Sequence, residues 1–135
     1  SALAGDRQTI QRARKIRRRM GGGWRQAGLL AAGALHAIEH HRERIAEDHQ
    51  RAKRLASELA RIEGLVPLSP CDSNILMVDT HDSPLNAFEW NAQLTERGVL
   101  QNVISASRLR LVTHLDIDDE GLDFAVSIFR EIAGS

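Results

Sequence analysis

The chain has little cysteine, few aromatic residues and no long apolar run. Cys71 is the single cysteine among the 135 residues, so no internal disulfide can form, and we expect a reducing compartment, the cytoplasm. No stretch approaches the roughly 18 consecutive apolar residues that a transmembrane helix needs. No signal peptide is recognisable either. We therefore expect a protein with no membrane partner.

The composition is that of a soluble globular domain, but the charge is unevenly spread. Hydrophobic residues make up 42% of the chain and charged residues 27%, and the formal net charge is zero. Residues 1–25 carry eight basic residues and a single acid, Asp6, a balance of +7, whereas the remainder carries ten basic and seventeen acidic residues, a balance of −7. This asymmetry predicts a local anion site or an acidic partner surface rather than a generally basic protein.

Residues 14–33 combine arginines, glycines and an apolar helix start, reading RKIRRRMGGGWRQAGLLAAG. Arginine guanidinium groups bind anions in a fork geometry. Glycines allow close approach or a positive φ, and the first turn of a helix has free N–H groups. This order predicts a place where an anion, such as a phosphate, meets the start of a helix.

The first half of the chain is predicted to be helical. Apolar residues recur at helical spacing over residues 7–19, and the glycines at 21–23 end that helix. A second helix is predicted from near Trp24, and its small residues indicate tight packing against another helix or subunit. Residues 39–62 continue the pattern, which fits either one helix over 24–62 or two with a bend near His41.

The second half alternates between strands and helices. We predict a loop at 67–70, a buried strand over 74–80, a helix from Ser83-Pro84 to Arg97, strands over 99–104 and 108–113, and a last helix capped by Asp118. The fold class is α/β with an α+β-like small domain: long N-terminal helices, then a small, largely antiparallel sheet with helices packed on one face. Residues 1–38 would form the basic helix, the glycine turn and an interdomain or subunit-packing helix, and residues 39–135 the small domain.

Five blocks of the sequence carry a resemblance to a known family. In order they are RARKIRRRMGGGWRQAG, HHRERIAEDHQRAKRLASEL, SNIL, RGVL and LRLVTH. They resemble blocks of the pyridoxal-phosphate-dependent threonine aldolases, fold type I enzymes of the β-eliminating lyase group. The glycine block alone is a weak signal, whereas the same blocks in the same order over nearly the whole chain are a strong one.

The resemblance implies an enzyme of which this chain is one part. Such an enzyme needs a lysine that binds pyridoxal 5′-phosphate, and neither Lys15 nor Lys53 stands in the family's Ser-Lys context. We therefore expect the C-terminal part of an aldolase, inactive alone and without a catalytic residue of its own. The whole enzyme would cleave L-threonine or L-allo-threonine and similar β-hydroxy-α-amino acids to glycine and an aldehyde, as a homodimer or homotetramer.

Three arginines are the candidate site residues. Arg110 alternates with two leucines on a strand, which by itself describes a solvated side chain. The resemblance implies instead that Arg110 binds the substrate α-carboxylate, with Arg108 a weaker candidate on the same face. It also implies that Arg25 and Arg18 border the cofactor, although Arg18 stands where the family usually has lysine. Trp24 replaces the family's usual methionine.

The remaining reactive residue types suggest no further site. His36 and His40 are four residues apart but lack a third ligand at useful spacing, so we predict no metal site. His49 lies on an apolar stripe and is predicted to pack, and His114 lies either near the site or in a structural role. Cys71 has no evident base and is predicted to be inert. The acids at positions 116, 118, 119 and 120 are typical of a helix start.

Two other function classes stay open from the sequence. One is a nucleic-acid-binding module that uses the basic run Arg12 to Arg25. Zero net charge, few aromatic residues and the lack of a known binding motif argue against it, and a steep salt dependence of DNA or RNA binding would favour it. The other is a dimerisation domain with no chemistry of its own, for which the small-residue helix over 27–37 is the best evidence.

Overall fold

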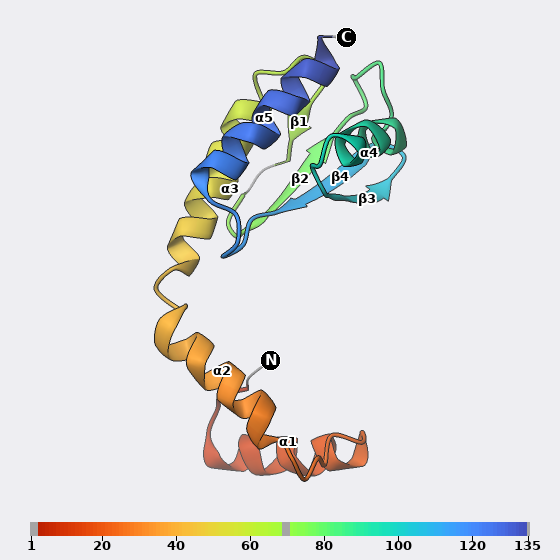
Figure 1. The fold of residues 1–135 in the computed structure, drawn as a ribbon. Helices are drawn as coiled ribbons and strands as arrows, with labels where there is room; N and C mark the ends of the chain where they lie inside the picture. Colours follow the sequence, from red (N-terminus) through yellow and green to blue (C-terminus); the bar gives the residue numbers. More distant parts are fainter. Residues whose placement is uncertain (1–2, 69–70, 135) are drawn as a thin grey trace. The chain divides into compact units, whose positions relative to one another are not determined.

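A computed structural model describes residues 3–68 and 71–134 (Figure 1). The chain divides into two compact units, residues 1–43 and 44–135, and each is described here by itself. The boundary predicted after residue 38 falls within the last turn of the second helix, which ends at His40. The packing role of residues 1–38 stays a prediction.

The first unit holds two helices, α1 (Arg7–Arg19) and α2 (Gly28–His40). The Asp6 carboxylate accepts the Thr9 backbone N–H at 2.8 Å and caps α1, and this hydrogen bond holds the pKa of Asp6 below its usual value. The bounds predicted for α1 are confirmed. Among the described residues of α1 and α2 none is buried, although α2 is apolar on most of its surface.

The start predicted for the second helix is wrong by several residues. α2 begins at Gly28, and residues 25–27 form turns before it. No side chain caps α2 at Ala27, so no capping residue marks the start of this helix in the sequence. The turn at residues 41–44 separates α2 from α3 (Ile45–Leu59), which decides for two helices rather than one.

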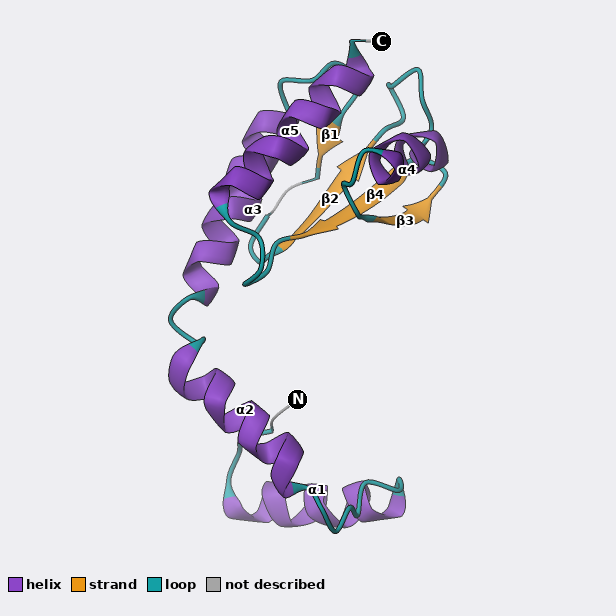
Figure 2. Ribbon diagram, viewed as in Figure 1, coloured by secondary structure: helices purple, strands orange, loops and turns teal. Residues whose placement is uncertain are grey.

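The second unit is a four-stranded antiparallel sheet with three helices. The sheet order is β1-β2-β4-β3 (Figure 2). α3 and α5 lie side by side, and α4 packs over β3 and β4. The further elements are β1 (Val66–Pro67), β2 (Ile75–Asp79), α4 (Ala87–Glu96), β3 (Asn102–Ser105), β4 (Arg108–Val112) and α5 (Asp119–Ala133).

One face of the sheet forms the core of the second unit. Alternate residues of the two central strands are buried there: Leu76, Val78, Leu109 and Leu111. They belong to one hydrophobic cluster with buried side chains from α3, α4 and α5, in which the rings of Trp90 and Phe129 lie 5.5 Å apart. The predicted fold class, with helices on one face of an antiparallel sheet, is confirmed.

The larger differences from prediction in this unit concern β1, α4 and β3. β1 falls where a loop was predicted from Pro67; proline is tolerated because β1 is an edge strand. Residues 69–70 of that loop lie outside the described residues. α4 begins at Ala87 because Asn86 and Glu89 form a capping box, whereas the predicted cap, Ser83, accepts the Trp90 indole N–H instead. β3 begins at residue 102 rather than 99.

The last helix is the best predicted element. The Asp118 carboxylate accepts the Gly121 N–H at 2.8 Å and caps α5, as predicted. Its apolar side is buried in the core, with Ala125 partly buried and these residues fully so: Leu122, Val126, Ile128, Phe129 and Ile132. The predicted acids in its first turn, at 119 and 120, stabilise the positive end of the helix dipole.

Candidate functional site

The sheet face opposite the core, here called the open sheet face, carries the charged strand residues. It consists of residues 75, 77 and 79 of β2 and residues 108, 110 and 112 of β4, which alternate with the buried leucines and valine. Ile75 and Val112 are 43% and 40% exposed. The described residues of the second unit therefore leave this face partly open to solvent.

Arg110 lies at the middle of the open sheet face. Its strand neighbours are Met77 on β2 and Asn102 on β3. The Nε atom is buried and has no hydrogen-bond partner, and no carboxylate within residues 3–68 and 71–134 pairs with this guanidinium. An unpaired buried donor of a charged group is costly, so this position favours the binding of an anion.

Arg108, two residues away on the same face, has a different environment. Its Nε lies 3.6 Å from Oδ2 of Asp79, its direct cross-strand neighbour, and its side chain is 52% exposed. Oδ1 of Asp79 accepts the His81 backbone N–H at 2.8 Å. The tertiary structure thus distinguishes two arginines that lie on the same face: Arg108 has an acidic partner, and Arg110 has none in the described residues.

Three of the motif blocks meet at Thr113. The Thr113 hydroxyl donates to the backbone carbonyl of Asp48 in α3 at 2.7 Å. The Thr113 N–H donates to the Asn74 carbonyl at 3.0 Å, and the Asn74 side-chain amide donates to the Thr113 carbonyl at 2.7 Å. Sequence reasoning missed this node because its three residues are far apart in the chain. These blocks fix the position of β4, and hence of Arg110, relative to α3.

The RGVL block ends α4. Gly98 has a φ of +84°, which favours glycine, and the Val99 N–H donates to the Leu94 carbonyl at 2.9 Å. Val99 is then buried in the core while Leu100 is 80% exposed. This block therefore has a structural explanation and contributes no site residue.

The glycine block ends α1 rather than starting α2. Gly21 has a φ of +81°, and the Gly22 N–H donates to the Arg17 carbonyl at 2.8 Å, the pattern of a Schellman motif. A Cβ on Gly22 would lie 2.7 Å from Cγ of Arg17. These glycines therefore do not stand at the start of a helix, because residues 24–27 separate them from the first N–H groups of α2, and the binding of an anion at this segment stays a prediction.

Arg18 and Arg25 lie in the first unit, whereas Arg110 belongs to the second. Both are exposed, and no acid within the described residues pairs with either. Trp24 beside them is 62% exposed. The first unit thus carries Arg18 and Arg25 and the second carries Arg110, and each environment is described within its own unit.

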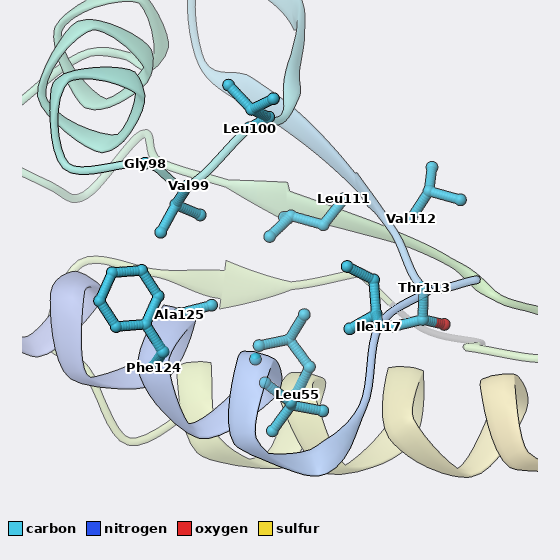
Figure 3. A pocket seen from close by; sticks show the side chains of 12 residues that line it. Leu55, Gly98, Val99, Leu100, Leu111, Val112, Thr113, Ile117, Phe124 and Ala125 are labelled. Atoms are coloured by element: carbon cyan, nitrogen blue, oxygen red, sulfur yellow. The ribbon is translucent and has the colours of Figure 1, made fainter. Parts of the chain in front are cut away.

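The apolar cavity in Figure 3 lies in the second unit between α5, β4 and the segment after α4, with Leu55 of α3 reaching toward it. Its volume is about 210 Å³. No side chain that lines it is ionisable: it is bounded by residues such as Val99, Leu111, Ile117 and Phe124. The cavity offers space but no group for acid–base or anion chemistry.

The other candidates from the sequence are not assembled into a site. The His36 ring lies 4.4 Å from that of His40 and 5.2 Å from that of His41, but no three His, Cys, Asp or Glu residues in the described part of the chain are grouped to hold a metal. Nδ1 of the half-exposed His114 accepts the Asp116 N–H in the loop before α5. Partial burial raises the pKa of the Cys71 thiol.

Neither lysine is enclosed. Lys15 and Lys53 are both exposed on the surfaces of α1 and α3. An amine that forms a covalent bond with a cofactor is normally held in a pocket that lowers its charge or fixes its direction. No described helix is both long and apolar enough to span a bilayer.

Comparison with known proteins identifies the family. The model of the Beta-eliminating lyase family matches residues 1–83. Probable low-specificity L-threonine aldolase 2 of Arabidopsis thaliana is 36% identical over 134 residues, covering 98% of this chain and 38% of that protein. The low specificity L-threonine aldolase of Escherichia coli K12 is 37% identical over 122 residues, covering 90% and 35%.

The fold is also similar to a solved structure. A cystine C–S lyase in complex with its product, cysteine persulfide, superposes with a TM-score of 0.63 over 78% of this chain and 28% of that one, at 23% identity. That likeness concerns the fold alone. The chain spans little more than a third of the length of its curated relatives, 35% and 38%. With more than half of its residues matched by the family model, the chain belongs to the Beta-eliminating lyase family.

Proposed function

We propose that the whole protein is a pyridoxal-phosphate-dependent lyase that cleaves L-threonine, L-allo-threonine and similar β-hydroxy-α-amino acids to glycine and an aldehyde. This chain would supply the arginine that holds the substrate. The observation that carries the proposal is Arg110, a guanidinium on the open sheet face whose buried Nε has no partner in the described residues. Two curated relatives at 36% and 37% identity bear the name L-threonine aldolase.

Arg110 suits an α-carboxylate. A planar guanidinium binds a carboxylate with two parallel hydrogen bonds, which fix the direction of the bound molecule as well as its place. The strand backbone and the node at Thr113 hold the arginine before any ligand arrives. The bound carboxylate would supply the hydrogen bond that the buried Nε lacks in the described residues.

The chemistry itself requires the cofactor, which withdraws electrons from the substrate when it is bound. The Cα–Cβ bond breaks, the β-hydroxyl loses its proton as it becomes the aldehyde carbonyl, and Cα takes up a proton to give glycine. Arg110 contributes orientation: it holds the carboxylate so that the Cα–Cβ bond has the direction in which it breaks. We expect this chain alone to be inactive, because both of its lysines are exposed and neither stands in the family's Ser-Lys context.

Arg18 and Arg25 are proposed to bind the cofactor's anionic end. Both are exposed and lack an acidic partner in the described residues, and they belong to a segment with a charge balance of +7. The apolar surface of α2, with Leu29 and Leu30 83% and 57% exposed, supports the prediction that this helix packs against another part of the protein or a second subunit. Assembly as a homodimer or homotetramer and a cytoplasmic location remain predictions.

The test is kinetic and uses the whole protein. Glycine and acetaldehyde formed from L-threonine are measured for the wild type, Arg110→Ala and, as a matched control, Arg130→Ala, an exposed arginine of α5 that pairs with Glu58. A charged hydrogen bond contributes about 1.5–3 kcal/mol, so Arg110→Ala should lower kcat/KM by about 10- to 150-fold, mainly through KM. Arg130→Ala should retain the wild-type kcat/KM within about twofold. Arg130 belongs to α5 rather than to the open sheet face, and an exposed ion pair contributes little to stability.

Two outcomes count against the proposal in different ways. If the wild-type protein releases no glycine from any β-hydroxy-α-amino acid, the proposed activity is wrong. If the wild type is active and Arg110→Ala keeps its kcat/KM, the activity stands but the role of Arg110 is wrong. The visible absorbance of the bound cofactor should be the same in wild type and Arg110→Ala, which separates a loss of substrate binding from a loss of cofactor.

A further inference from the structure

The open sheet face carries two arginines, and within the part of the chain that the structure describes only Arg110 lacks an acidic partner. Arg108 and Arg110 lie two residues apart on β4, so their Cα atoms are about 6.6 Å apart on the same side of the sheet. Asp79 lies directly across from Arg108 on β2. Its side chain is only 22% exposed and uses both oxygens, Oδ1 for the His81 N–H and Oδ2 toward Arg108.

We propose that Asp79 determines substrate specificity by keeping Arg108 out of the substrate site, so that the site takes β-hydroxy-α-amino acids with a single carboxylate. This inference rests on the proposed function. Consider a substrate whose α-carboxylate is bound to Arg110 and whose β-carbon carries a second carboxylate. That second carboxylate would lie beside Arg108, two residues along β4. There it meets the Asp79 carboxylate and an arginine already engaged with it.

Asp79 acts against a dicarboxylic substrate in two ways. Its own negative charge repels a second carboxylate, and its contact with Arg108 withholds the cation that could neutralise that carboxylate. Asp79 itself cannot turn away readily, because the His81 N–H holds its other oxygen at 2.8 Å. The Arg108 side chain is 52% exposed, so its guanidinium group has room to turn toward another anion once Asp79 no longer holds it. Removing the acid should therefore free Arg108 to bind a second carboxylate.

The experiment compares two substrates of the whole enzyme. L-Threonine gives glycine and acetaldehyde, and 3-hydroxyaspartate gives glycine and glyoxylate through cleavage of the same Cα–Cβ bond. The quantity measured is the ratio of kcat/KM for 3-hydroxyaspartate to kcat/KM for L-threonine, in the wild type, Asp79→Asn, Arg108→Gln and the double variant. Because both rates come from one preparation, a partial loss of folded enzyme cancels from the ratio.

We expect Asp79→Asn to raise this ratio by about tenfold, the lower end for one new charged hydrogen bond. Asparagine still accepts the His81 N–H, and Asp79→Ser carries the same prediction should the asparagine variant not fold. In the Arg108→Gln background the same change removes only the repulsion, so the gain should shrink to about threefold or less. Asp79→Glu, which keeps the charge, should keep the wild-type ratio.

Two results would overturn the inference. One is an unchanged ratio in Asp79→Asn and Asp79→Ser. The other is a full gain that persists when Arg108 is glutamine, which would mean that Arg108 takes no part. Absence of L-threonine cleavage by the wild type is a separate result, which overturns the proposed function itself.

Discussion

Gly64 and Gly98 have nearly the same backbone conformation in very different surroundings. Their φ angles are +81° and +84°, in the left-handed region that side chains disfavour. A Cβ on Gly98 would meet no atom within 4 Å, whereas a Cβ on Gly64 would lie 2.6 Å from Cα and 2.9 Å from N of Ser83. The two positions therefore separate the cost of conformation from the cost of a backbone clash.

The expected losses of unfolding free energy differ accordingly. In Gly98→Ala a left-handed penalty of about 1–2 kcal/mol is partly offset by about 0.4–1 kcal/mol from the less flexible unfolded chain, a net loss of about 1 kcal/mol. Gly64→Ala bears the same net loss and adds about 1–3 kcal/mol for the overlap with Ser83, because backbone atoms cannot rotate away. We expect a total of about 2–4 kcal/mol.

The measurement is urea unfolding of this chain, followed by the fluorescence of Trp90, which is 1% exposed and lies in the core. A Trp24→Phe background removes the signal of the exposed indole in the other unit. With a slope of about 1–3 kcal/mol per molar, Gly98→Ala should lower the midpoint by about 0.3–1 M and Gly64→Ala by at least twice as much. Gly33→Ala, in helix α2 with nothing within 4 Å of its Cβ, should leave this transition unchanged. Equal losses in Gly64→Ala and Gly98→Ala would refute the reasoning.

Two further predictions use the same chain. Asp118→Ala removes the carboxylate that accepts the Gly121 N–H and should lower the free energy of unfolding by about 1 kcal/mol in the same urea assay. Asp116 is 88% exposed, so Asp116→Ala should leave that free energy almost unchanged. Equal effects of the two changes would show that the cap is not formed. Burial raises the pKa of the Cys71 thiol, so less thiolate is present at a given pH. Alkylation of Cys71 by iodoacetamide should therefore be slower than that of a cysteine in a short peptide, and the pH midpoint of the reaction should lie higher. Unfolding in urea should speed the alkylation up. A midpoint equal to that of the peptide would contradict the burial of this thiol.

Several features of the fold follow from local sequence. The bounds of α1 come from a cap at Asp6 and the glycine at 21, and the start of α5 comes from Asp118. These signals act within four residues, so the sequence contains all that is needed to read them. β1 could not be predicted, because a two-residue strand has no periodicity and exists only through its pairing with β2. The start of α4 required a choice between two capping residues that the Trp90–Ser83 contact decides.

Part of the candidate site follows from the sequence, and part depends on tertiary contacts. The family motifs point to Arg110, Arg25 and Arg18, and the role of each is still a prediction. The alternation of Leu109, Arg110 and Leu111 places the arginine opposite the core, as the structure confirms. No motif indicated the node at Thr113, because its hydrogen bonds join residues from α3, β2 and β4.

By itself the sequence determined the family blocks, the bounds of α1, the start of α5 and the face on which Arg110 lies, since each depends on spacing along the chain. Only the tertiary structure decided which of the two strand arginines is free. Among residues 3–68 and 71–134, Arg108 has an acidic partner and Arg110 has none, because the register of β2 and β4 places Asp79 beside one and Met77 beside the other. That register is set by side chains packing in the core, which no local pattern records.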